Sequence, residues 1–120
     1  MIKAKSFSHC GLRVTDVERA TRFYEDVLSL KKLPRPNFPF GGAWYGVGEN
    51  QIHLISSDQN MGKINPLGPH LAIQVEDFAA AKAELTRRGI EFLEAPPNAG
   101  GNQLWILDPD GNTIELRSGN

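Results

Sequence analysis

Three histidines and one glutamate are the residues of this 120-residue chain whose types and spacing suggest chemistry. When the sequence is shifted against itself by 61 residues, His9 falls on His70. One residue inserted in the second copy makes the shift 62, and His53 then falls on Glu115. All three histidines of the chain and one carboxylate therefore occupy two repeat-related positions. Imidazole and carboxylate groups are typical ligands of a divalent ion, and zinc, nickel, iron, cobalt and manganese all suit them.

The chemistry of such a ligand set follows from its charge. Three neutral imidazoles and one carboxylate leave a divalent ion with a formal charge of about +1, which makes it a Lewis acid for a carbonyl or for bound water. Glu115 is the only carboxylate of the four. A histidine bound to a metal ion uses for coordination the nitrogen that would otherwise accept a proton, so it is a poor base. We therefore expect Glu115 to be the catalytic base and acid as well as a ligand.

The repeat predicts the elements that position these side chains, because each copy reads as a strand, a helix and three strands. Asp16 and Asp77 are natural N-caps. The apolar residues of the first helix follow helical spacing from Val17 to Leu28, and Gly89 can end the second helix in a left-handed conformation. The last two strands of each copy are joined by turns at Gly48 to Asn50 and at Pro109 to Asn112.

Alternation along the strands sorts the side chains into two faces. One face is apolar and should pack on the helices; it carries Cys10, Leu12, Val14, Ile52, Leu54, Leu71, Ile73, Val75, Ile114 and Leu116. The other face carries all four candidate ligands and Arg13. A pseudo-twofold relation between the copies would bring the four ligands to a common centre.

The length and composition indicate one α+β domain spanning 1–120, with module one at about 5–57, a linker at about 58–67 and module two at about 68–118. The net charge of -1 and the lack of a basic stripe exclude nucleic acid as a partner. Apolar runs are far shorter than the roughly 20 residues that span a bilayer, so no membrane contact is expected. The single cysteine, Cys10, agrees with a cytoplasmic location and is expected to be an inert packed thiol.

The segments around these residues resemble a known family, the vicinal oxygen chelate superfamily of glyoxalase I, extradiol dioxygenases, methylmalonyl-CoA epimerase and the fosfomycin and bleomycin resistance proteins. The resemblance covers nearly the whole chain and is carried by SHCGLRVTDV (8–17), RFYEDVLSL (22–30), QIHLI (51–55), PHLAIQVED (69–77) and DPDGNTIEL (108–116). It implies paired βαβββ modules that form a curved, incomplete-barrel mixed sheet around the metal, with the helices on the outer face. It also places the metal ligands on the first and last strands of each module, at the four positions that the repeat had selected.

The resemblance is closest to glyoxalase I and implies lactoylglutathione lyase-like isomerisation or lyase chemistry on a small oxygenated substrate. In that reading Glu115 is the proton shuttle, and Arg13 matches a residue that contacts a glutathione carboxylate. Two positions depart from the glyoxalase I pattern: His53 stands where glutamate is usual, and Ser57 stands where asparagine is expected.

Other members of the superfamily supply the alternatives. An extradiol-type dioxygenase or a fosfomycin-type thiol transferase would need only His9, His70 and Glu115. A drug-sequestering protein of the bleomycin resistance type would be a metal-free binding protein, so metal content separates it from the enzymes. The open edges of two short sheets and the resemblance both predict a homodimer, in which metal sites are often shared between chains.

Overall fold

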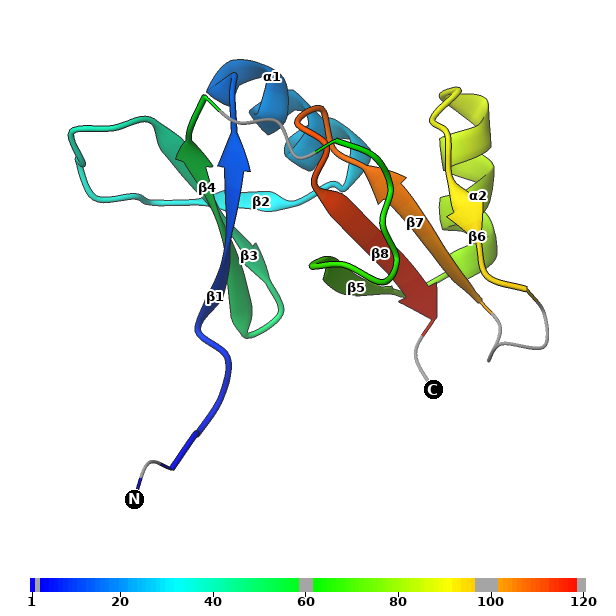
Figure 1. Ribbon diagram of the computed structural model, residues 1–120, viewed down its shortest axis with the longest axis horizontal. Helices are drawn as coiled ribbons and strands as arrows, with labels where there is room; N and C mark the ends of the chain where they lie inside the picture. Colours follow the sequence, from blue (N-terminus) through cyan, green and yellow to red (C-terminus); the bar gives the residue numbers. More distant parts are fainter. Residues whose placement is uncertain (2, 59–61, 97–101, 119–120) are drawn as a thin grey trace. The chain divides into compact units, whose positions relative to one another are not determined.

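The computed structural model describes residues 1, 3–58, 62–96 and 102–118 (Figure 1). The chain divides into two compact units, Met1–Asn60 and Met61–Asn120. Part of the expected linker, 59–61, and part of the expected second module, 97–101, lie outside the described residues.

The first unit is a four-stranded sheet with one helical segment between its first two strands. In chain order its elements are β1 (His9–Val14), α1 (Val17–Arg22), the π-helical turn η1 (Phe23–Val27), β2 (Lys31–Leu33), β3 (Gly42–Val47) and β4 (Asn50–Ser56). Its strands follow the order β1-β4-β3-β2, with β1 parallel to β4 and the other pairs antiparallel.

The second unit repeats this arrangement strand for strand. Its elements are β5 (Leu71–Val75), α2 (Phe78–Arg87), β6 (Leu93–Glu94), β7 (Gln103–Leu107) and β8 (Thr113–Ser118). The strand order β5-β8-β7-β6 again has one parallel pair, β5 with β8. The predicted α+β class, built from two βαβββ modules, is confirmed.

The register of the strands confirms the repeat residue by residue. Trp44 pairs with His53 across β3 and β4, and Trp105 pairs with Glu115 across β7 and β8. The parallel pairs agree, since Gly11 lies opposite His53 and Ala72 lies opposite Glu115. The His53 and Glu115 positions are therefore structurally equivalent, as the shift of 62 predicted.

The turn between β7 and β8 accounts for the inserted residue. Asp108 Oδ1 accepts hydrogen bonds from the backbone N–H groups of Asp110 and Asn112, at 2.9 and 2.8 Å. Asn112 also donates its side-chain Nδ2 to Asp108 Oδ2 at 2.8 Å, and Gly111 has a φ of 81°. This bonded turn is one residue longer than the tight turn at Gly48, and it sets the position of Glu115 along β8.

The predicted apolar face forms the core. Val14, Ile52 and Leu54 are at most 2% exposed, and Ile114 and Leu116 are also buried. Cys10 lies on this face, half-buried, and burial raises the pKa of its thiol, as expected for an inert packed cysteine.

Both helices begin at the predicted caps. Asp16 accepts from the N–H of Arg19 at 3.0 Å, and Asp77 accepts from the N–H of Ala80 at 2.9 Å. Among the residues that the structure describes, no helix has the length and apolar character that a bilayer crossing requires.

The first helix departs from the expectation of one regular helix from Val17 to Leu28. It is α-helical only to Arg22 and continues as a π-helical turn, in which Leu28 N–H bonds to the carbonyl of Phe23. Ser29, at φ 56°, ends this helix where Gly89, at φ 69°, ends the second, a spacing of 60 residues instead of 61. The first helix thus contains one extra residue, and a wide π turn accommodates it.

These two left-handed helix ends give a matched stability test. Ser29→Gly should stabilise the chain by up to about 1 kcal/mol, because glycine adopts φ > 0 without the penalty that a Cβ imposes. Gly89→Ala should destabilise it by a similar amount, and the added Cβ would meet no atom within 4 Å, so the cost is conformational. Urea unfolding of both variants measures the two changes in the free energy of unfolding. If Ser29→Gly destabilised the chain, Ser29 would not have the left-handed conformation described here.

Candidate metal centre

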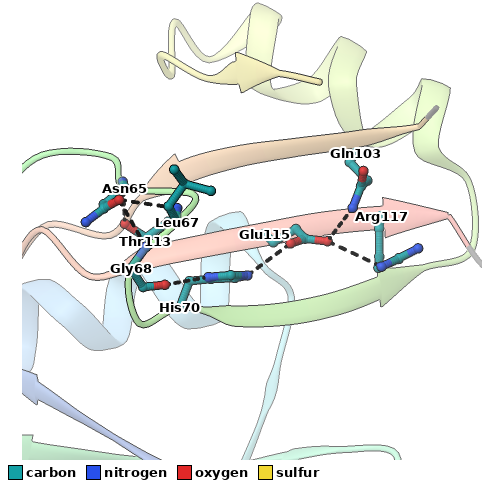
Figure 2. A network of polar contacts seen from close by, with 8 residues as sticks. All are labelled: Asn65, Leu67, Gly68, His70, Gln103, Thr113, Glu115 and Arg117. Atoms are coloured by element: carbon teal, nitrogen blue, oxygen red, sulfur yellow. Dashed lines mark hydrogen bonds and ion pairs between the residues drawn. The ribbon is translucent and has the colours of Figure 1, made fainter. Parts of the chain in front are cut away.

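The second unit brings His70 and Glu115 together (Figure 2). Glu115 projects from the middle of β8 and is only 4% exposed, although sequence alternation had placed it on the polar face. His70 immediately precedes β5, and its Nε2 lies 3.1 Å from Glu115 Oε1. The Nδ1 of the same ring lies 2.9 Å from the carbonyl oxygen of Gly68.

The bond to Gly68 decides which nitrogen of His70 is available. A carbonyl oxygen only accepts, so Nδ1 must carry a proton, and in the neutral ring Nε2 then carries a lone pair. That lone pair faces a carboxylate oxygen, which is also an acceptor, so a proton or a metal ion must lie between the two atoms. Ligating histidines usually donate their other ring N–H to a carbonyl in this way. The pair therefore fits a divalent ion.

The second oxygen of Glu115 is held by neighbouring strands. Gln103 Nε2, on β7, donates to Glu115 Oε2 at 3.1 Å, and Arg117 Nη1 lies 3.6 Å from the same oxygen. These contacts compensate the burial of the carboxylate and fix its orientation, leaving Oε1 toward His70. Gln103 was missed at the sequence level, although it shares the strand parity of Trp105, which pairs with Glu115.

A turn before β5 sets the position of Gly68. Asn65 Oδ1 accepts from the N–H groups of Leu67 and Gly68, and the Asn65 N–H donates to Thr113 Oγ1 on β8 at 3.1 Å. The turn is thereby tied to the strand that carries Glu115 (Figure 2). From the sequence, Asn65 had been assigned to the linker at about 58–67 and Gly68 to the start of module two.

The first unit brings His9 and His53 together in a different way. Their rings are stacked, with centroids 4.0 Å apart and planes 15° apart. The other face of His53 stacks on Trp44 at 3.9 Å. His53 Nε2 lies 2.8 Å from Gln51 Oε1, and His9 Nδ1 lies 3.0 Å from Ser8 Oγ.

This stacked pair does not hold an ion as it stands. An imidazole lone pair lies in the ring plane, so two nearly parallel rings 4.0 Å apart cannot both point at one ion until one ring rotates. His9 lies at the exposed start of β1 and has the room to rotate, whereas His53 is held between two rings. Burial lowers the pKa of His53, and the neighbouring charge of His9 lowers it further, which keeps His53 neutral.

The five predicted site residues thus fall into two pairs of candidate ligands and one arginine. Arg13 lies on β1, exposed, with the same strand parity as His9. Within residues 3–58, 62–96 and 102–118, no three His, Cys, Asp or Glu side chains form a group that could hold an ion. Each unit therefore presents two of the four candidate ligands.

Comparison with known proteins gives the family. The model of the Glyoxalase/Bleomycin resistance protein/Dioxygenase superfamily matches residues 6–116, nearly the whole chain. The chain belongs to this superfamily. The glyoxalase superfamily is the one that the sequence segments had indicated, so that expectation is confirmed.

Relatives within the glyoxalase superfamily include named enzymes. Glyoxylase I 4 of Arabidopsis thaliana is 31% identical over 123 residues, with 92% of this chain and 69% of the relative covered. The lactoylglutathione lyase of Salmonella typhimurium is 33% identical over 120 residues, with 90% and 88% covered. A mutant of the fosfomycin resistance protein FosX from Listeria monocytogenes, solved with Mn(II) and 1S,2S-dihydroxypropylphosphonic acid, has a TM-score of 0.81. The match covers 98% of this chain and 95% of the FosX chain. At 17% identity, it shows a shared fold alone.

Proposed function

We propose that this chain is a metal-dependent lactoylglutathione lyase-like enzyme, which isomerises a small substrate carrying two adjacent oxygen functions. The observation that carries the proposal is the His70–Glu115 pair, in which Nε2 and Oε1 lie 3.1 Å apart, so that a proton or a divalent ion must lie between them. The lyases among the relatives, at about a third identity over most of the chain, support the reaction type.

The proposed ligands are His9 and His53 from the first module and His70 and Glu115 from the second. His70 and Glu115 are the best prepared, because each has its second polar atom held by another residue. His9 would bind after rotation of its ring, and His53 is the weakest of the four because it is stacked on both faces. When bound, a divalent ion supplies a Lewis acid that makes the C–H beside a substrate carbonyl or hydroxyl acidic.

Glu115 is the proposed proton carrier. It would take the proton from the carbon that bears the hydroxyl group and return it to the neighbouring carbon, as base and then as acid. Its burial suits this work, because a transferred proton is shielded from water. Arg13, exposed on β1, is the proposed contact for a glutathione carboxylate.

The proposal is tested with the full chain loaded separately with zinc, nickel, iron(II), cobalt or manganese. Each form is given methylglyoxal with glutathione and with other thiols, and thioester formation is followed by absorbance. We expect turnover with at least one ion and loss of turnover with a chelator. Cleavage of catechols by the iron form would instead support a dioxygenase, and thiol addition to fosfomycin would support a transferase. Drug binding by a metal-free chain would support a sequestering protein.

We also propose a homodimer located in the cytoplasm. Each sheet leaves two edge strands, β1 and β2 in the first and β5 and β6 in the second, and open edges favour association. The single cysteine agrees with a reducing compartment. Sedimentation equilibrium gives the mass in solution, and a monomer at working concentrations contradicts the dimer.

A further inference from the structure

A pocket of about 550 Å³ opens on the first module, beside its two histidines. Its lining is largely aromatic and basic and includes His9, Arg35, Phe38, Phe40, Trp44 and His53. A group bound in this pocket would therefore lie next to the first-module ligands. Within the lining no side chain is acidic, and Arg35 is the one permanent charge.

Arg35 is held in place, and within the described part of the chain it uses one of its five N–H donors. Its guanidinium carbon lies 5.0 Å from the ring centroid of Phe38 and 5.2 Å from that of Phe40. Its Nη2 donates to the carbonyl oxygen of Phe40 at 2.7 Å. The Nε is buried and has no hydrogen-bond partner among the residues that the structure describes. Among the described residues, no carboxylate lies within ion-pair distance of Arg35, although a guanidinium offers five donors and pairs best with a planar anion.

The walls of the pocket beside Arg35 consist largely of aromatic rings in contact with one another. Phe38 and Phe40 are stacked at 5.1 Å, Phe38 lies 6.2 Å from Trp44, and Trp44 stacks on His53. Phe38 and Phe40 are 38% and 48% exposed, unusual for large apolar side chains grouped together. Ring faces exposed in a pocket are matched by a flat apolar ligand.

We propose that this pocket is the specificity site for a substrate group with a planar apolar body and a carboxylate. The rings would hold the body, and Arg35 would pair with the carboxylate. The inference rests on the proposed function, because His9 and His53 line the same pocket, and it names the substrate class: an aryl or similarly flat 2-oxo compound that carries an acid group.

The test compares two ligands of the same shape on the full chain by calorimetry, phenylacetate and its neutral isostere phenylacetamide, with a chelator present. Phenylacetate should bind wild-type protein, and Arg35→Met should weaken it about tenfold to hundredfold, the range of a charge-assisted hydrogen bond. The same variant should change phenylacetamide binding by less than about threefold, because methionine keeps an apolar stem. Phe38→Leu should weaken both ligands alike.

Three results would overturn the proposal. Equal phenylacetate binding by Arg35→Met and wild type would remove Arg35 from recognition. Equal loss of both ligands in Arg35→Met would mean that Arg35 only holds the loop. Binding of glutathione that depends on Arg35, with no binding of phenylacetate, would mean that the carboxylate belongs to the thiol instead.

A failure of the proposed binding pocket can be distinguished from a failure of the proposed reaction. With a chelator present there is no turnover, so ligand binding is measured independently of the metal centre. Phenylacetate binding with no isomerase activity under any metal would contradict the proposed reaction, while turnover of methylglyoxal with no phenylacetate binding would contradict the pocket.

Discussion

Glu115→Gln should retain part of the bound metal and lower isomerase turnover by about 10²-fold or more, the usual contribution of a general base. The amide keeps the shape of the side chain and one weak oxygen ligand, but it cannot accept a proton at neutral pH. When its one oxygen faces His70, the amide N–H groups take the place of Oε2, and Gln103 must turn its own amide so that its oxygen accepts from them. We therefore expect a variant that still binds the ion but has little isomerase activity.

Metal content and initial rates, measured on the same preparation, check this prediction. Glu91→Gln is the matched control, because it makes the same chemical change at an exposed carboxylate outside both ligand pairs, and it should leave turnover unchanged. A Glu115→Gln protein that binds metal and turns over near the wild-type rate would remove Glu115 from the mechanism. Oxygen-activating or transferase chemistry, with Glu115 only a ligand, would then be favoured.

His70→Ala should weaken metal binding by more than about 100-fold, because loss of even an outer partner of a ligand costs about 10- to 100-fold. The Gly68 carbonyl already fixes the ring so that Nε2 faces Glu115. Without that ring, Glu115 is the only ligand left in the second unit.

His53→Ala serves as the matched comparison, since it makes the same substitution in the other pair. His53 is stacked between Trp44 and His9 and bonded to Gln51, so its removal should weaken metal binding less than His70→Ala does. Competition with a coloured chelator gives both affinities. A larger loss in His53→Ala than in His70→Ala would reverse the proposed ranking of the ligands.

The fold followed from the sequence because its determinants are local and occur twice. The caps at Asp16 and Asp77 mark the starts of the two helices, and alternation marks the strands. The histidine that recurs in both copies marks the first strand of each. Each of these signals can be recognised without the rest of the chain. The π-helical turn could not be predicted from the sequence. The one extra residue leaves the apolar spacing from Val17 to Leu28 almost the same as in a regular α-helix.

Only part of the arrangement of the candidate ligands could be predicted from the sequence. Parity and the repeat placed His70 and Glu115 on the same face with the other two candidates, and these two residues are in contact in the structure. They could not show that Glu115 is buried, since that depends on donors from other strands, such as Gln103. Nor could they show the stacking of His9 on His53, which depends on side-chain torsions and not on strand register.

Elemental analysis of freshly purified protein shows whether these four residues bind a divalent ion. We expect about one divalent ion per chain in the wild type, near-complete loss in His70→Ala, reduced content in His9→Ala and Glu115→Ala, and the smallest loss in His53→Ala. Retention of the wild-type metal content by all four variants would mean that other residues bind the ion, and the proposed metal centre would be wrong.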